Sequence, residues 1–161
     1  MEILQFAIDM ELDGEQYYRE QAAKNVNNAL QTVFTLLADD EAKHADILRS
    51  KQGNKPYVLA AQPELNRQMN LFHGETDYKA SVTEMPDQPE LYHTAMEKEQ
   101  QSIDLYTKLK GEATDEDSVA LFDFLIGEET NHRTLLEDMY QLVNRPNNWV
   151  EAAEFGVREE Y

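Results

Sequence analysis

The chain has 161 residues, of which 41% are hydrophobic and 29% charged, and its formal net charge is −18. Such an excess of acidic groups argues against binding to nucleic acid or to anionic membrane surfaces, because their phosphates would repel it. There is no cysteine, which excludes disulfides, thiolate zinc sites and cysteine-bound iron–sulfur centres. No apolar run reaches membrane-spanning length and no signal-peptide pattern is visible, so we expect a cytoplasmic protein.

The N-terminal part of the chain predicts two helices joined by a tight turn. Apolar residues recur at helical spacing over 4–22, and Asn25-Val26-Asn27-Asn28 is a turn signal whose asparagines can cap the next helix. A second helix is predicted over about 29–51, and Gly53-Asn54-Lys55-Pro56 is expected to stop it.

A less regular connector follows over 52–87, in which 62–72 can hold a short helix. A third helix is predicted over about 88–110, with Gly111 as its C-cap. No strand pattern competes with the long helical segments.

The last predicted helix begins at a cap formed by Thr114 or Asp115 and runs to about Asn144. Pro146 is expected to close it and to leave a short tail over 145–161. Four long helices without strands predict an all-α four-helix bundle.

An internal repeat becomes visible when the sequence is shifted by 88 residues. It divides a single domain, 1–161, into repeat 1 (about 1–51), a crossover (about 52–87), repeat 2 (about 88–144) and the tail. The long crossover allows the second and third helices to lie parallel. The matched residues are Ala7, Glu11, Tyr18, Phe34, Leu37, Asp40, Glu41, His44 and Leu48 in repeat 1, and Ala95, Glu99, Tyr106, Phe122, Leu125, Glu128, Glu129, His132 and Leu136 in repeat 2.

Each repeat contains Glu-x-x-His, at Glu41/His44 and at Glu129/His132. Residues three apart share a helix face, and here that face is the apolar one, where a carboxylate is costly unless a cation neutralises it. Glu11 precedes Glu41 by the same interval that separates Glu99 from Glu129, and each interval is centred on a predicted turn. We therefore expect one buried metal site made of Glu11, Glu41, His44, Glu99, Glu129 and His132.

Four carboxylates balance two divalent cations, and oxygen ligands with imidazole suit iron or manganese, with zinc as a substitute. The alternative is an ancestral site that has lost its metal. A third Glu-x-x-His, at Glu90/His93, is not repeated, and His93 is interpreted as an ordinary surface or helix-start histidine. His73 falls in the irregular connector and is expected to be solvated.

Tyr18 and Tyr106 lie two helical turns after Glu11 and Glu99. Their hydroxyls can hydrogen-bond the carboxylates and orient them, which makes them candidate functional residues outside the ligand set. The competing interpretation is core packing with a polar tip.

These motifs resemble the rubrerythrin branch of the ferritin-like superfamily, through Ala7-x-x-x-Glu11 with Tyr18, Glu41-Ala-Lys-His44 and their copies in the second repeat. The resemblance implies a ferritin-like four-helix bundle of two repeated hairpins that holds two iron ions and reduces peroxide. Many rubrerythrins carry a rubredoxin domain; the absence of cysteine implies instead an external electron donor protein. The family also offers an extra Glu on the third helix, whereas Ser102 and Met96 flank Glu99 here.

The leading hypothesis is a dinuclear-iron oxidoreductase of peroxidase or ferroxidase type, oxidising Fe(II) with reduction of hydrogen peroxide or dioxygen. One alternative is non-catalytic iron binding and handling; a storage role would need a multi-subunit shell, whereas a homodimer is also compatible with the sequence. Another is a di-iron oxygenase acting on an organic substrate, which would need an apolar pocket beside the metals.

Overall fold

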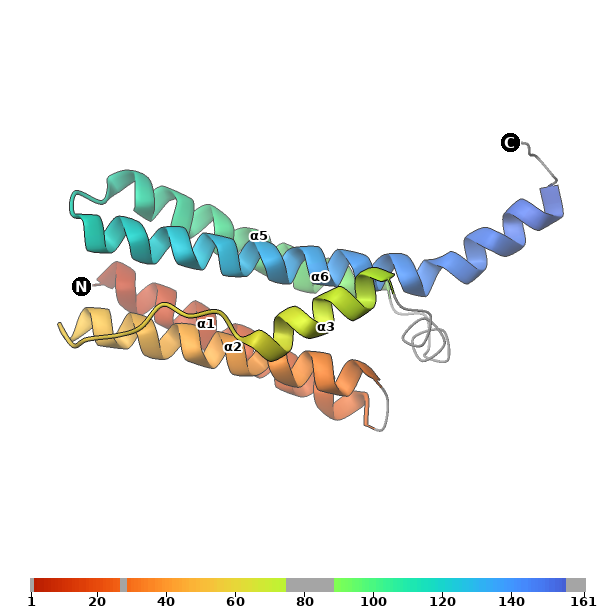
Figure 1. The fold of residues 1–161 in the computed structure, drawn as a ribbon, viewed down its shortest axis with the longest axis horizontal. Coiled ribbons are helices and arrows are strands. Elements are labelled where there is room, and N and C mark those ends of the chain that lie inside the picture. The colour runs from red at the N-terminus through yellow and green to blue at the C-terminus, as the bar shows by residue number, and fades with distance from the viewer. Residues whose placement is uncertain (1, 27–28, 75–88, 156–161) are drawn as a thin grey trace.

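Five α-helices make up most of the computed structural model, which describes residues 2–26, 29–74 and 89–155. No strand occurs within these ranges. The helices are α1 (Glu2–Lys24), α2 (Ala29–Gln52), α3 (Pro63–Gly74), α5 (Pro89–Glu112) and α6 (Glu116–Phe155). Figure 1 shows α1 and α2 as one hairpin, and α5 and α6 as a second hairpin lying alongside it. The predicted all-α, ferritin-like bundle is confirmed.

The connector crosses the length of the bundle. After α2 an irregular segment, 53–62, runs back along the helices and leads into α3, so α5 starts at the end of the bundle where α2 also starts (Figure 1). Helices α2 and α5 therefore run in the same direction, as a long crossover allows. The short helix expected over 62–72 is present as α3, and the rest of the connector, 75–88, lies outside the described residues.

Hydrogen bonds from nearby side-chain and backbone groups stabilise the ends of α2 and α6. Asp115 caps α6, because its carboxylate accepts the backbone N–H of Ser118 at 2.9 Å. Helix α2 ends at Gln52, and two residues later Asn54 has a left-handed φ of 56°. The backbone N–H groups of Asn54 and Lys55 then bond carbonyls of the last helical turn, at 3.2 and 2.8 Å. The predicted asparagine cap of α2 falls on residues outside the described ranges.

Two predicted helix ends are wrong. Gly111 does not cap α5, which continues to Glu112, because glycine tolerates helical dihedrals at a modest cost. Helix α6 does not stop near Asn144 but runs through Pro146 to Phe155, so the segment 145–155 is not a separate tail. A proline inside a helix removes one hydrogen bond and bends the axis without having to end the helix. In Figure 1 the axis of α6 changes direction where it extends past the other helices.

The apolar core divides into two clusters, and the 88-residue shift maps one onto the other. Tyr18 stacks on Phe34 with ring centroids 6.2 Å apart, and Tyr106 stacks on Phe122 at the same distance. Each pair belongs to a different cluster. The predicted hairpin repeat thus produces two equivalent hydrophobic layers with a polar layer between them.

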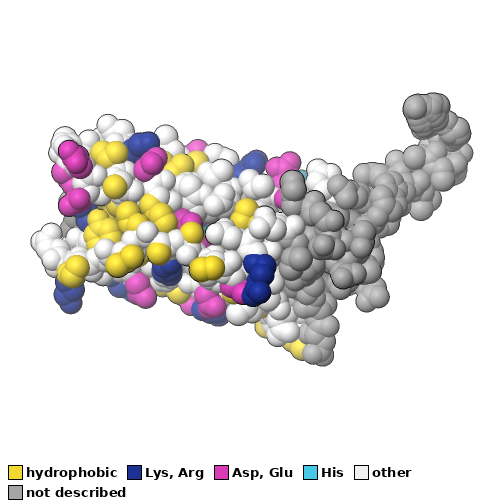
Figure 2. All heavy atoms as spheres, viewed as in Figure 1, with side chains coloured by type: hydrophobic (Ala, Val, Ile, Leu, Met, Phe, Trp, Pro, Cys, Tyr) yellow, Lys and Arg dark blue, Asp and Glu magenta, His cyan; other side chains and the backbone are white. Residues whose placement is uncertain are grey.

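The irregular segment after α2 covers part of the second cluster. Its Tyr57 and Leu59 pack against that cluster, whereas Val58 is exposed. Figure 2 shows hydrophobic side chains gathered toward the end of the visible face that this segment crosses, with acidic and basic side chains spread over the surface around them. None of the helices in the described ranges is long and apolar enough to cross a membrane.

Candidate metal centre

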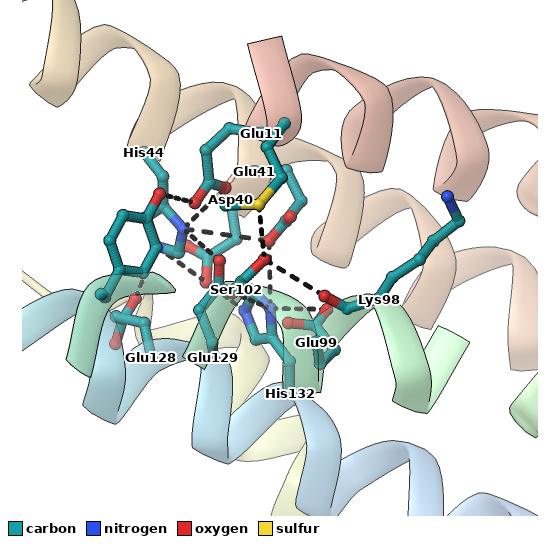
Figure 3. Close-up of polar contacts among 12 residues, drawn as sticks. Glu11, Asp40, Glu41, His44, Lys98, Glu99, Ser102, Glu128, Glu129 and His132 are labelled. Atoms are coloured by element: carbon teal, nitrogen blue, oxygen red, sulfur yellow. Dashed lines mark hydrogen bonds and ion pairs between the residues drawn. The ribbon is translucent and has the colours of Figure 1, made fainter. Parts of the chain in front are cut away.

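The six side chains expected to bind metal converge at the middle of the bundle, one or two from each long helix (Figure 3). None is more than 4% exposed. The i, i+3 spacing on α2 and on α6 turns each Glu and His of a pair toward the same point, as expected from the sequence. The structure brings together Glu11, Glu41, His44, Glu99, Glu129 and His132.

One half of the centre is built around His44. Its Nδ1 lies 3.3 Å from Glu11 Oε1, 3.8 Å from Glu41 Oε1 and 3.7 Å from Glu129 Oε2. These residues place four ligand atoms within 4.8 Å of one another, which is close enough to surround one ion.

The other half is built around His132. Its Nδ1 lies 3.3 Å from Glu99 Oε2, 3.2 Å from Glu41 Oε1 and 3.1 Å from Glu129 Oε1. Glu41 and Glu129 therefore belong to both halves. The centre therefore consists of two groups of possible metal ligands that share two carboxylates.

The tyrosines link the two hairpins. Tyr18 donates to Glu99 Oε2 and Tyr106 donates to Glu11 Oε2, each at 2.5 Å, so each hydroxyl bonds the carboxylate of the other repeat. Both rings also belong to the apolar clusters, so hydrogen bonding and core packing operate together. Burial, followed by the charge of the bonded glutamate, raises the pKa of both phenols well above its usual value.

Two further carboxylates, at positions matched by the 88-residue repeat, contact the imidazoles at Nε2, on the side away from the centre. His132 Nε2 lies 2.6 Å from Asp40 Oδ2, and His44 Nε2 lies 3.3 Å from Glu128 Oε1. Such contacts fix the ring orientation and leave Nδ1 for the centre. The available signal was an acidic residue directly before the Glu of each Glu-x-x-His.

These contacts shift the acidity of Asp40. Burial alone would raise its pKa, but the hydrogen bond to His132 and the positive charge of that ring outweigh burial and lower the pKa to about 2. Asp40 is therefore ionised throughout the physiological range and available as an acceptor for His132.

The carboxylates at the middle behave in the opposite way. Burial and the charges of Glu11 and Glu99 raise the pKa of Glu129 to about 8, and burial together with the neighbouring glutamates raises the pKa of Glu41 well above its usual value. Burial would lower the pKa of His44, but the charge of Glu11 outweighs it and raises that pKa. Without a cation, the centre retains protons that a divalent ion would displace.

The unpaired atoms of the centre test whether a metal fits. Among the described residues, eight buried side-chain N and O atoms have no hydrogen-bond partner, and seven of them belong to the six converging residues. Leaving buried polar atoms unpaired is costly, and coordination of cations by oxygen and imidazole donors relieves this cost. The donor set suits iron or manganese.

One other histidine singled out by the sequence, His93, lies at the surface. His93 is exposed and packs on Tyr140, with ring centroids 4.8 Å apart, which agrees with its interpretation as surface. The side chain of His73 lies outside the described residues. Ser102 Oγ donates to the Lys98 carbonyl oxygen at 3.2 Å and contacts Met10 Sδ at 3.7 Å.

Two related helical hairpins with a buried carboxylate and histidine centre between them place the chain in the ferritin-like class of four-helix bundles. A family model described as Rubrerythrin matches residues 2–140, and the chain belongs to the rubrerythrin family. Membership implies iron binding and a di-iron protein of ferritin-like type. The match includes all six converging residues and ends within α6. Comparisons with curated proteins and with solved structures gave no match.

Proposed function

We propose that this chain is a dinuclear-iron oxidoreductase that oxidises Fe(II) while reducing hydrogen peroxide or dioxygen. The observation that carries the proposal is the pair of four-residue groups that share Glu41 and Glu129. Two divalent ions would balance four buried carboxylates, which are otherwise hard to accommodate in an apolar bundle.

Each residue has a definite role in this proposal. Glu11 and His44 would hold one ion, Glu99 and His132 the other, and the two shared glutamates would lie between them. When bound, the iron pair supplies Lewis acidity and electrons for the reaction. Reduction of one hydrogen peroxide to two waters consumes two electrons and two protons.

The remaining residues of the chain position and shield the centre. Asp40 and Glu128 hold the imidazoles from outside, so that Nδ1 of each ring remains turned to the ligand cluster. The phenols of Tyr18 and Tyr106 each bond one carboxylate oxygen and leave the other for metal. The two apolar clusters exclude bulk water on both sides. We further propose that an external electron donor protein returns the irons to the reduced state.

The test combines metal analysis with stopped-flow oxidation. We expect two irons per chain, and reoxidation of the anaerobically reduced protein by peroxide or dioxygen within seconds. Glu99→Gln should lower the iron content, whereas Glu97→Gln, an exposed neighbour on the same helix, should not. A protein that binds two irons but stays reduced when mixed with either oxidant would instead be an iron-handling protein.

An organic substrate receives no specific support. The cavity that reaches the centre has a volume of about 90 Å³ and is lined partly by charged and polar residues, among them Asp13, Lys98 and Gln101. An oxygenase acting on a larger organic molecule would need a wider apolar pocket beside the metals.

A further inference from the structure

A narrow cavity connects the surface with the predicted metal ligands. Its inner wall includes Glu41 and Glu99, and its outer part includes the exposed residues Asp13 and Gln101. The cavity lies between α1 and α5, which come from different hairpins. Other surface hollows, such as those beside Leu105 and Leu109, contain none of the six ligands.

Two of the residues that line the cavity are small, and they occupy matched positions of the repeat. Gly14 and Ser102 are related by the 88-residue shift, and each stands three residues after a predicted ligand, Glu11 or Glu99. A Cβ added at Gly14 would lie 2.6 Å from Glu41 Oε2, so only glycine leaves room for that carboxylate to reach the cavity. Larger side chains at these two positions would close the gap.

The Ser102 hydroxyl is held by two contacts at the wall of the cavity. Its Oγ donates to the Lys98 carbonyl oxygen at 3.2 Å and lies 3.7 Å from Met10 Sδ, so the two side chains meet there. Met10 is partly buried and forms the opposing wall on α1. The width of the passage is therefore set by the Met10 side chain and by the size of residue 102.

We propose that this cavity is the access passage for the oxidant and that it selects by size, admitting dioxygen and hydrogen peroxide and excluding aryl hydroperoxides. The inference rests on the proposed function. The volume of about 90 Å³ is the argument for selection. An engineered apolar cavity of about 150 Å³ holds benzene, and the cavity beside the centre is smaller, so we expect it to exclude the ring of cumene hydroperoxide.

The test uses the iron-loaded full chain and two variants of the passage. Ser102→Leu fills it, and Met10→Ala widens it; neither residue is among the predicted ligands. Thr107→Leu, an exposed position on the same helix, is the control for adding the same side chain elsewhere. Rates of oxidation of the reduced protein are measured with hydrogen peroxide and with cumene hydroperoxide, and azide association with the oxidised protein is followed optically.

We expect Ser102→Leu to slow both hydrogen peroxide oxidation and azide association by about tenfold or more, because an entering molecule must displace a packed leucine. Iron content and the Thr107→Leu rates should match the unmodified protein. Met10→Ala should raise the rate with cumene hydroperoxide relative to hydrogen peroxide by about tenfold.

Two results would overturn the proposal that this cavity is the access passage. One is equal azide association in the Ser102→Leu and Thr107→Leu proteins. The other is a Met10→Ala protein in which the ratio of the cumene hydroperoxide rate to the hydrogen peroxide rate is the same as in the unmodified protein. This second measurement also tests the proposal if Ser102→Leu fails to fold. If the reduced, unmodified protein is inert to every oxidant, the proposed function fails, and azide association alone then decides whether this cavity is the passage.

Discussion

At the scale of single residues, the centre is governed by the two shared glutamates. Glu41 and Glu129 each lie within 3.8 Å of Nδ1 in both imidazoles, and burial among like charges raises the pKa of both. Such a carboxyl group is protonated when no metal is bound and ionised when a cation lies beside it. Metal binding is therefore coupled to release of a proton.

Metal removal should therefore reverse the usual pH dependence of stability. The pKa of Glu129 is about 8 in the folded chain against an ordinary glutamate value of 4.5, so the folded state holds a proton that the unfolded state releases between these values. This contribution to stability is complete below about pH 4.5 and is lost as the pH rises toward 8. The raised pKa values of His44 and His132 act in the same direction, with losses beginning above the unfolded histidine value.

We expect the thermal unfolding midpoint of the chelator-treated protein to fall from pH 5 to pH 9, a range about four units wide that covers these titrations. The iron-loaded protein should not show this fall, because bound cations replace the protons. A midpoint that rises with pH in the chelated protein would contradict the assignment of protons to these groups.

Asp40 provides a second residue-scale prediction. Asp40→Asn keeps the shape of the side chain but removes the charge that faces His132 Nε2, so the ring loses its preferred orientation. Iron affinity should decrease by roughly 10- to 100-fold. The neighbouring Asp39 is exposed and pairs with Arg19, so Asp39→Asn is the matched control. Iron affinity is measured by competition with a chelator. Equal iron affinities of the Asp40→Asn and Asp39→Asn proteins would show that Asp40 does not orient His132 for metal binding.

At the scale of secondary-structure elements, helix ends determine how the hairpins join the connector. Just after α2 ends at Gln52, Asn54 adopts φ of 56°, and the backbone N–H of Lys55 donates to the Ser50 carbonyl oxygen. This turn directs the chain back along the bundle toward α3. Its conformation matters because the segment after it packs over the second apolar cluster.

Substitutions at Asn54 should follow the cost of left-handed backbone. Asn54→Ala is expected to lower the free energy of unfolding by about 1 kcal/mol, whereas Asn54→Gly should leave it unchanged or raise it. Denaturant unfolding of the iron-loaded protein measures both. Alanine and glycine variants of equal stability would show that the turn does not require this conformation in the folded chain.

The helices and their contacts also show which features could be predicted from the sequence and which could not. Periodicity and the 88-residue repeat predicted the long helices and the six converging residues. They did not predict that α6 continues through Pro146, since a proline signal alone does not separate a bend from an end. Spacing likewise places Tyr18 on the same face as Glu11 but cannot say which helix that face meets, so the bond to Glu99 required the packed structure. The role of Asp40 was missed for the same reason.

At the scale of the whole molecule, the chain carries a net charge of −18, which includes the buried carboxylates of the candidate metal centre. A strongly negative surface raises the local concentration of divalent ions and speeds their association, and salt screens this effect. The surface charge and the buried carboxylates thus act in the same direction on iron uptake.

Iron uptake should accordingly slow as ionic strength rises. Between about 20 and 300 mM sodium chloride, we expect the rate of Fe(II) association to fall about tenfold, with a smaller change in the amount bound. Stopped-flow mixing of the chelator-treated protein with Fe(II) under anaerobic conditions measures this rate. If the rate of Fe(II) association did not change with salt, the surface charge would have no effect on iron uptake.

The crossed tyrosine bonds have a consequence for how the centre fills. Tyr18 of the first hairpin restrains Glu99, and Tyr106 of the second restrains Glu11, so each hairpin helps to order a ligand of the opposite ion. We expect these bonds to couple the two groups of ligands, so that iron loads cooperatively and half-filled molecules are scarce at intermediate iron. A substitution in one repeat is then expected to weaken iron binding in both groups.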